Sequence, residues 1–224
     1  MDSYPIPNNK TKEVLALQYL RSYLVVACDK PVAILMAGIP GAGKTEYAKD
    51  LADQYLKQNE QILLIDLDEI RALFPGYTGK DAHRYQNAAS VVMERIIDKA
   101  IHLKYNFILD GTLQKLDVAR KNLTRLLSPR HPYRGGIEIH YVIRDKTTAW
   151  EFTQKRERIE RRKILKETFE EACNTVMGNV KSLKAEFGND NEVHLIVKPP
   201  GNKEPYTIQN ISESHPLLQS QSEL

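Results

Sequence analysis

The stretch Ala33-Ile34-Leu35-Met36-Ala37-Gly38-Ile39-Pro40-Gly41-Ala42-Gly43-Lys44-Thr45 decides the fold. Its first five residues are apolar and predict a buried strand, which runs through a glycine-rich turn into a helix. The pattern G-x-x-x-x-G-K-[ST] of a phosphate-binding loop is matched by Gly38, Gly43, Lys44 and Thr45. In such a loop the backbone N–H groups point inward at a phosphate, and the helix N-terminus favours the anion. The stretch therefore predicts a phosphate site.

This loop, the P-loop, gives each of its residues an expected role. Lys44 is expected to reach the β- and γ-phosphates of ATP, and the Thr45 hydroxyl is expected to ligate Mg²⁺. A chance glycine-rich turn is the alternative, and the strand before the loop and the helix after it argue against that. We therefore expect the nucleotide to be bound by Gly38, Ile39, Pro40, Gly41, Ala42, Gly43, Lys44 and Thr45.

The composition is that of a globular chain with one core. The 224 residues suit a single α/β domain, and a net charge of +3 gives no case for nucleic acid or membrane binding. Cys28 and Cys173 form no disulfide framework, which indicates a reduced, cytoplasmic protein. The six histidines are scattered without paired metal spacing, which argues against a zinc site. The first residues lack the pattern of a signal peptide, and no apolar run approaches the length of a membrane span.

Apolar runs alternate with helical periodicity along most of the chain. We expect strands at residues 32–37, 61–65, 106–109, 137–143 and 192–197, and helices at 11–27, 44–58, 81–103, 114–127 and through most of 147–187. The alternation predicts a P-loop NTPase fold of the α/β class, with three α/β/α layers, a mostly parallel five-stranded sheet and a helical lid.

Three strand ends carry residues suited to chemistry. In an open parallel sheet, ligands bind at the carboxyl ends of the strands. The P-loop follows the first strand, Asp66 and Asp68 follow the second, and Asp110 follows the third. Because phosphoryl transfer to a hydroxyl commonly uses a carboxylate to take the proton, Asp68 and Asp66 are candidates for the base. Asp110 is a candidate for binding metal-bound water or the acceptor.

Structural alternatives exist for these carboxylates. Asp68 could be the N-cap of a short helix, and Asp110-Gly111-Thr112 could be a simple turn. Both alternatives are weakened because the same sheet edge holds the P-loop, and a site can also use an N-cap carboxylate.

Residues 155–163, Lys-Arg-Glu-Arg-Ile-Glu-Arg-Arg-Lys, are the densest basic stretch. Such a run is usually a solvated helix face with i,i+4 ion pairs, to which Glu157 and Glu160 would contribute. It follows the fourth strand, however, where P-loop kinases place a lid over the nucleotide. One or two of its arginines are therefore candidates for a clamp on the γ-phosphate.

Taken in order, the P-loop, Asp68-Glu69-Ile70-Arg71, Leu109-Asp110-Gly111-Thr112 and the arginine-rich stretch resemble the zeta-toxin family across roughly residues 30–200. That resemblance implies an ATP- and Mg²⁺-dependent P-loop kinase, the toxin of a bacterial toxin–antitoxin system. It also implies phosphorylation of the sugar 3′-hydroxyl of UDP-N-acetylglucosamine or a similar nucleotide sugar, and a protein antitoxin as partner.

The resemblance also assigns roles. Asp68 would be the base, Arg71 would bind substrate or brace Asp68, and Asp110, Gly111 and Thr112 would hold the acceptor sugar. In this comparison Asp110 stands where well-known members have Glu, the lid arginines are closely spaced, and residues 72–80 match no sugar pocket we can assign. The lid arginines would be Arg156 and Arg162, with Arg158 and Arg161 as competitors.

Composition and apolar pattern along the chain set the expected limits of its parts. These are an N-terminal arm and helix at 1–29, a kinase domain at 30–200 with its lid near 150–166, and a tail at 201–224. Two alternatives stay open: a kinase acting on a nucleoside, an antibiotic or a polynucleotide 5′-hydroxyl, and a nucleotide-dependent switch.

Overall fold

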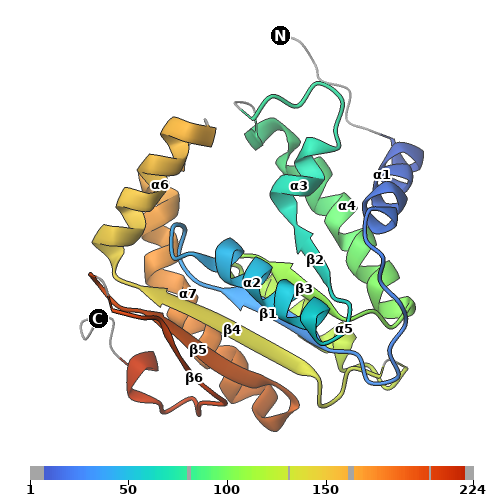
Figure 1. Ribbon diagram of the computed structural model, residues 1–224. Coiled ribbons are helices and arrows are strands. Elements are labelled where there is room, and N and C mark those ends of the chain that lie inside the picture. The colour runs from blue at the N-terminus through green and yellow to red at the C-terminus, as the bar shows by residue number, and fades with distance from the viewer. Residues whose placement is uncertain (1–7, 80–81, 131, 161–163, 202, 220–224) are drawn as a thin grey trace.

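The computed structural model describes residues 8–79, 82–130, 132–160, 164–201 and 203–219. One sheet runs through the centre, with its strands in the order β2-β3-β1-β4-β5-β6 (Figure 1). Every neighbouring pair is parallel except β5 and β6. The strands are β1 (Ala33–Ala37), β2 (Leu63–Asp66), β3 (Phe107–Asp110), β4 (Ile137–Arg144), β5 (Glu192–Lys198) and β6 (Tyr206–Ile208).

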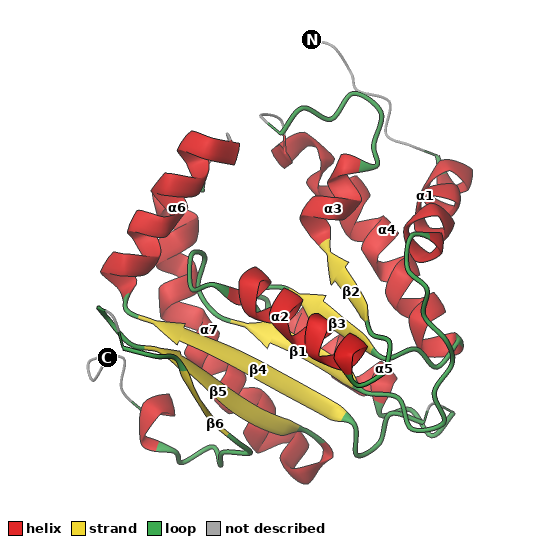
Figure 2. Cartoon of the chain, in the orientation of Figure 1, coloured by secondary structure: helices red, strands yellow, loops and turns green. Residues whose placement is uncertain are grey.

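Helices flank the sheet on both sides (Figure 2). In Figure 1, α2 crosses one face over β1, while α5 and α7 pass behind the other. Among the described residues, no helix is long and apolar enough to cross a membrane. The helices are α1 (Asn9–Arg21), α2 (Lys44–Lys57), α3 (Leu67–Ala72), α4 (Ala82–His102), α5 (Leu116–Leu126), α6 (Lys146–Glu160) and α7 (Lys166–Phe187), with short 3₁₀ turns at Gly188–Asp190 and Pro216–Leu218.

The expected α/β/α fold is confirmed, but the sheet has six strands where five were expected. The additional strand, β6, pairs antiparallel with β5, with Val197 opposite Tyr206. It consists of three residues and follows a proline-rich stretch, so it is too short to show an alternating pattern. Ile211 and Leu218 beyond it are buried, so the segment after residue 201 contributes to the core.

The N-terminal helix is shorter than its apolar pattern suggested. Helix α1 ends at Arg21, because Ser22 closes it with backbone hydrogen bonds to Gln18 and Tyr19. The expected helix continued to residue 27, but Leu24 and Val26 are exposed. The buried residues of α1 are Leu15, Ala16 and Tyr19.

Tyr19 and its neighbour Tyr23 fasten α1 to the sheet and to α3. The Tyr19 hydroxyl donates to the carbonyl of Leu64 at 2.7 Å and accepts from the backbone N–H of Asp66 at 3.1 Å. Tyr23 donates to Glu69 at 2.9 Å. Helix α1 is therefore an integral part of the core that supports the end of β2.

Candidate active site

The P-loop connects the buried strand β1 to α2 at the carboxyl edge of the sheet. The backbone N–H of Gly38 donates to the carbonyl of Thr112 at 3.2 Å, which ties the start of the loop to the segment after β3. The Lys44 ammonium donates to the carbonyl of Ile39 at 2.9 Å, so its side chain turns back across the loop. Gly43, the N-cap of α2, has a φ of 90°, which a residue with a side chain rarely adopts. Sequence and backbone therefore agree on a phosphate cradle.

Gly41 brings the P-loop into contact with α6. A Cβ atom at this position would lie 2.0 Å from the carbonyl oxygen of Ala149 and 3.1 Å from Cγ2 of Thr153. Such contacts are closer than van der Waals distance, so only glycine lets the loop and the helix pack this tightly. The first two turns of α6 therefore lie directly against the P-loop.

Thr45 and Asp110 link the P-loop to the end of β3. The Thr45 hydroxyl donates to Oδ2 of Asp110 at 2.6 Å. The strand register places Asp66 beside Asp110 at the ends of β2 and β3. The carboxylates that the sequence placed on this sheet edge are therefore neighbours of one another and of the P-loop.

The N-cap of α3 is Asp66, whereas the sequence left Asp68 as the candidate cap. Oδ1 of Asp66 accepts from the backbone N–H of Asp68 at 2.8 Å. Burial raises the pKa of Asp66 to about 6. The hydrogen bond from the Asp68 backbone lowers this pKa, and the nearby charges of Asp68 and Asp110 raise it. Asp68 lies in the first turn of the helix, where the helix dipole favours a carboxylate.

Asp68 is held by a buried arginine. Arg71, one turn further along α3, forms an ion pair with Asp68 and is only 5% exposed. Its other terminal nitrogen donates to the side chain of Gln86 on α4. The Asp68 side chain is 30% exposed, so it reaches solvent while its partner does not. The sequence analysis missed Gln86, because nothing in the pattern of α4 distinguishes it from other polar residues.

The segment after β3 is held in shape by α7. Leu113 has a φ of 59°, in the left-handed region that costs a residue other than glycine energy. Asn179 donates through Nδ2 to the carbonyls of Leu113 and Gln114, at 2.9 and 2.7 Å. Thr112 accepts from Gln114 as well, at 3.3 Å. Asn179 was missed by the sequence analysis, although a lone amide beside the buried positions of an amphipathic helix was the available signal.

Of the lid arginines, the structure describes Arg156 and Arg158, whereas Arg162 and Arg161 lie outside the described residues. Arg156 follows Ala149 and Thr153 at helical spacing, so it shares the face of α6 that packs on the P-loop. Arg158 is exposed and lies nine positions after Ala149, on the opposite face. At the base of α6, the Arg144 guanidinium lies 4.6 Å from the ring centre of Phe152.

Lys198, at the end of β5, is a second lysine beside the P-loop. Its ammonium donates to the carbonyl of Gly43 at 3.0 Å and lies 3.6 Å from a carboxylate oxygen of Glu46. Burial lowers the pKa of Lys198 below the ordinary value for lysine. The charge of Glu46 raises this pKa, and the charge of Arg144 lowers it further. The sequence analysis missed Lys198, although the strand-end argument that selected Asp110 applies to it equally.

A pocket of about 320 Å³ opens next to the P-loop, at the end of β4. It extends toward the start of α6 and toward Cys173 of α7, and it combines apolar walls with charged side chains. Its lining is Ile39, Tyr141, Val142, Ile143, Arg144, Asp145, Lys146, Thr147 and Cys173.

Relatives of known sequence match part of this chain. The chain is 35% identical over 102 residues to toxin PezT of Streptococcus pneumoniae serotype 4, covering 41% of this chain and 38% of PezT. It is also 31% identical over 136 residues to the HslU ATPase subunit of the ATP-dependent protease of Lactobacillus leichmannii, covering 58% of this chain and 27% of HslU. The chain thus spans well under half the length of these two relatives.

Solved structures share the whole fold. A structure from the PezAT chromosomal toxin–antitoxin system of Streptococcus pneumoniae superposes with a TM-score of 0.70 at 21% identity, covering 90% of this chain and 81% of that one. The AvrRxo1-ORF1:ORF2 complex with ATP gives 0.68 at 14% identity, covering 91% and 67%. The family model described as "Zeta toxin" matches residues 20–211, most of the chain, which confirms the resemblance drawn from the motifs. The chain therefore belongs to the zeta toxin family.

Proposed function

We propose that the protein is a kinase that transfers the γ-phosphoryl group of ATP to a sugar hydroxyl of a nucleotide sugar, UDP-N-acetylglucosamine or a close analogue. We further propose that it acts as the toxin of a toxin–antitoxin system in the cytoplasm. The observation that carries the proposal is the hydrogen bond from Thr45 to Asp110 at 2.6 Å. It joins the P-loop to the edge where Asp68 and Arg71 lie, so donor and acceptor groups meet in one place.

On the donor side, the P-loop backbone and Lys44 bind the phosphates of ATP. Lys44 already points across the loop to the carbonyl of Ile39, so a bound phosphate needs only to replace that carbonyl as its acceptor. Lys198, bonded to the carbonyl of Gly43, adds a second positive charge at the start of α2. Both ammonium groups can stabilise the negative charge of a bound triphosphate.

The residues at the mouth of the loop fit a magnesium ion. Mg²⁺ takes oxygen ligands, and it is usually held by one or two protein oxygens together with substrate phosphates. The Thr45 hydroxyl and the Asp110 carboxylate supply such oxygens from two elements that already meet. Mg²⁺, when bound, neutralises charge on the phosphates. This arrangement favours metal-bound water over the acceptor as the partner of Asp110.

On the acceptor side, Asp68 takes the proton of the attacking sugar hydroxyl. The hydroxyl oxygen bonds to the γ-phosphorus, the bond from that phosphorus to the β–γ bridging oxygen breaks, and ADP leaves. Arg71 is buried and paired with Asp68, so we assign it the bracing role and not sugar binding. We assign Gly111 and Thr112, next to Asp110, to the lining of the proposed sugar site.

Arg156 is the lid arginine that we assign to the γ-phosphate. It lies on the face of α6 that packs against Gly41, and a cationic group there can stabilise charge in the transition state. The role of Arg162 stays a prediction.

A toxin of this kind has to be restrained in its own cell. Helix α1 is held in the core by Tyr19 and Tyr23, so it is not available as an inhibitory segment. We therefore place the restraint in a separate antitoxin protein, as in the toxin–antitoxin system from which the similar S. pneumoniae structure comes.

Induced expression in a bacterial host tests the proposed toxicity. We expect the wild type to arrest growth, and Lys44→Ala and Asp68→Asn to abolish the arrest at equal expression level and unchanged circular dichroism. Asp98→Asn is the matched control. This substitution makes the same chemical change at an exposed position of α4, where Asp98 pairs with Arg125. Growth arrest that persists in Lys44→Ala would show that any toxicity does not come from phosphoryl transfer.

A further inference from the structure

The strands β4 and β5 each carry a glutamate followed two residues later by a histidine: Glu138 and His140 on β4, Glu192 and His194 on β5. The parallel register places Glu138 beside Glu192 and His140 beside His194. Because side chains alternate between the two faces of a strand, all four point to the same face of the sheet. The histidines are scattered in the sequence, but strand pairing brings two of them together.

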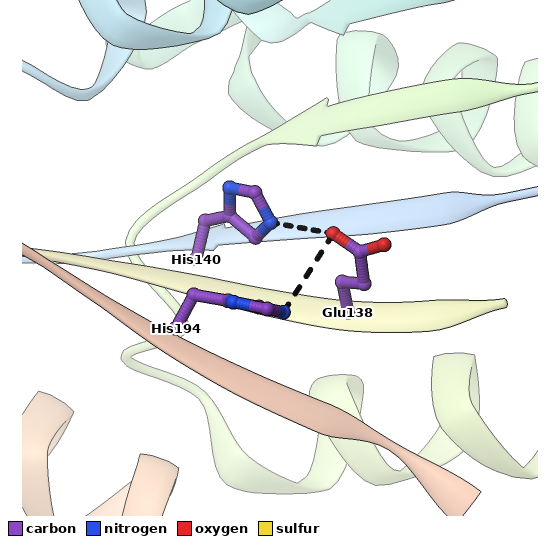
Figure 3. A group of neighbouring side chains, drawn as sticks. All are labelled: Glu138, His140 and His194. Carbon is purple, nitrogen blue, oxygen red and sulfur yellow. Dashed lines mark hydrogen bonds and ion pairs between the residues drawn. The ribbon is translucent and has the colours of Figure 1, made fainter. Parts of the chain in front are cut away.

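The side chains of this cluster converge on one carboxylate (Figure 3). Nε2 of His140 lies 2.7 Å from Oε2 of Glu138, and Nε2 of His194 lies 3.9 Å from the same oxygen. The rings of the two histidines are 4.9 Å apart. Glu138, His140 and His194 thus each offer one ligand atom, and these three atoms lie within 4.8 Å of one another. The Tyr47 hydroxyl, from α2, lies 3.0 Å from the other nitrogen of His140.

One nitrogen of His194 lacks a hydrogen bond within this cluster. The residue is 9% exposed, and its Nε2 atom is buried without a hydrogen-bond partner. Carboxylate oxygens of Glu192 and Glu138 lie at ion-pair distance from that nitrogen, at 3.3 and 3.9 Å. Buried polar atoms are nearly always paired, so an atom of this kind facing two carboxylates points to an additional group between them.

We propose that Glu138, His140 and His194 bind a divalent transition-metal ion, with Zn²⁺ as the best fit. Two imidazoles and one carboxylate are a recurrent zinc ligand set, and zinc accepts a fourth ligand such as water or another carboxylate. Glu192, at the exposed rim, is the nearest carboxylate for that position. Ligand atoms of a zinc tetrahedron lie about 3.3 Å apart. The three ligand atoms here lie within 4.8 Å of one another, so shifts of these atoms by about 1–1.5 Å suffice to form the site.

The surroundings support this chemistry. Although burial opposes it, the hydrogen bond and charge from His140, with the charge of His194, lower the pKa of Glu138 and keep it a carboxylate. Burial, followed by the charge of His140, lowers the pKa of His194 and favours the neutral ring that a metal requires. The Tyr47 hydroxyl can accept a hydrogen bond from Nδ1–H of His140, which would fix the tautomer whose Nε2 lone pair is directed at the ion.

The proposed site lies between the strands and α2, close to the P-loop: His140 is opposite Met36 of β1, and Tyr47 of α2 contacts it. His140 and His194 lie four residues before Arg144 and Lys198, the last residues of their strands. At about 3.3 Å per residue this is some 13 Å from the ends of β4 and β5, but only about 7 Å along β1 from Met36, which lies opposite His140, to the start of the P-loop at Gly38. A bound ion would link β4 to β5 within the sheet and stabilise the part of the fold from which the P-loop extends. Ligands that bind only the folded state raise the free energy of unfolding.

Titration of the chelator-treated, full-length protein with ZnCl₂ tests the site, by calorimetry and by thermal unfolding. We expect one Zn²⁺ per chain and a rise in the unfolding temperature, with no comparable binding of Mg²⁺ to these residues. Glu138→Gln and His194→Gln should each weaken Zn²⁺ binding by at least about tenfold to a hundredfold. The control is His102→Gln, which removes an exposed histidine at the end of α4 and should bind zinc as the wild type does.

Two results would overturn the proposal. One is a wild-type protein that binds no stoichiometric zinc, in which case the cluster is a hydrogen-bonded group only. The other is zinc affinity in Glu138→Gln and His194→Gln equal to that of His102→Gln. Because Glu138 is half-buried and glutamine has the same shape, that variant keeps the test valid if His194→Gln fails to fold.

Discussion

Asp66 is the residue whose charge the fold opposes most clearly at the candidate site. It is half-buried beside Asp110 and close to Asp68, and its pKa rises from 3.8 to about 6. Because the folded state holds the proton more tightly than the unfolded chain, the stabilisation that results is fully present below pH 3.8. It is lost as the pH rises through about 6.

Asp66→Asn should remove this pH dependence and keep the cap, since asparagine caps helices as well as aspartate does. We expect the variant to gain stability relative to the wild type between pH 4 and pH 7, by up to about 3 kcal/mol at 1.4 kcal/mol per pKa unit. Denaturant unfolding across that range, in a buffer with chelator, measures the difference. A difference that stays constant with pH would contradict the raised pKa.

The two described lid arginines make a second comparison at the residue scale. Arg156→Ala should lower kcat by about 10³-fold, because an arginine on the γ-phosphate acts in the transition state. Arg158→Ala, on the opposite and exposed face of α6, should leave kcat within about twofold. Steady-state kinetics with ATP decides the matter. Equal losses of kcat in both variants would contradict a specific role for Arg156 and would indicate that the total positive charge of α6 matters instead.

Pattern and position identified most individual residues of the site. Thr45 and Asp110 were expected at one sheet edge, and they are in contact. The identity of the α3 cap was not predictable, because Asp66 and Asp68 are both preferred cap residues and only the end of β2 decides between them. Asn179 could not be assigned either, since it acts on a segment 65 to 66 positions earlier in the chain.

At the scale of elements, the contact between the P-loop and α6 depends on one glycine. Gly41→Ala would put a methyl group 2.0 Å from the carbonyl of Ala149, at a φ of 78° that also strains alanine. We expect α6 to be displaced, ATP affinity to fall at least about tenfold, and amide exchange to accelerate in the first turns of α6. Hydrogen-exchange mass spectrometry with ATP titration measures both effects. Unchanged exchange in residues 146–153 would contradict the packing described.

Gly178, in α7, is the matched glycine with the opposite expectation. A Cβ atom there would meet nothing within 4 Å, and the position lies inside a helix. Gly178→Ala should therefore stabilise the protein by about 0.5–1 kcal/mol, because alanine loses less backbone entropy in a helix. Denaturant unfolding checks the sign, and a loss of stability would show that α7 is constrained there by something other than propensity.

The elements themselves were largely predictable, with two instructive exceptions. The long periodic segment α4 was identified to within one residue at each end, whereas α6 and α7 were expected only as one mostly helical region at 147–187. The end of α1 was missed, because Leu24, Val25 and Val26 continue an apolar pattern that the fold leaves partly or largely exposed. β6 was missed, because pairing with β5 creates a strand that its three residues would not form alone.

At the scale of the whole molecule, strand order brings the proposed chemistry together. The P-loop, Asp68, Asp110 and Lys198 come from four strand ends that are up to 160 positions apart, and the parallel sheet places them on one edge. The sequence supports that conclusion, because carboxyl ends of parallel strands share an edge. It does not supply the acceptor, whose shape is determined by loops that carry no general pattern.

The measurement that tests the account most directly is phosphoryl transfer by the purified protein with ATP and Mg²⁺. The acceptor panel contains UDP-N-acetylglucosamine, other nucleotide sugars, a nucleoside, an antibiotic with free hydroxyls and a 5′-hydroxyl oligonucleotide. We expect ADP and a sugar phosphomonoester, located by ³¹P NMR, only with nucleotide sugars. Asp68→Asn should lower kcat by about 10²- to 10⁴-fold with ATP binding retained. Phosphate on the oligonucleotide but not on the sugars, or undiminished transfer by Asp68→Asn, would contradict the account.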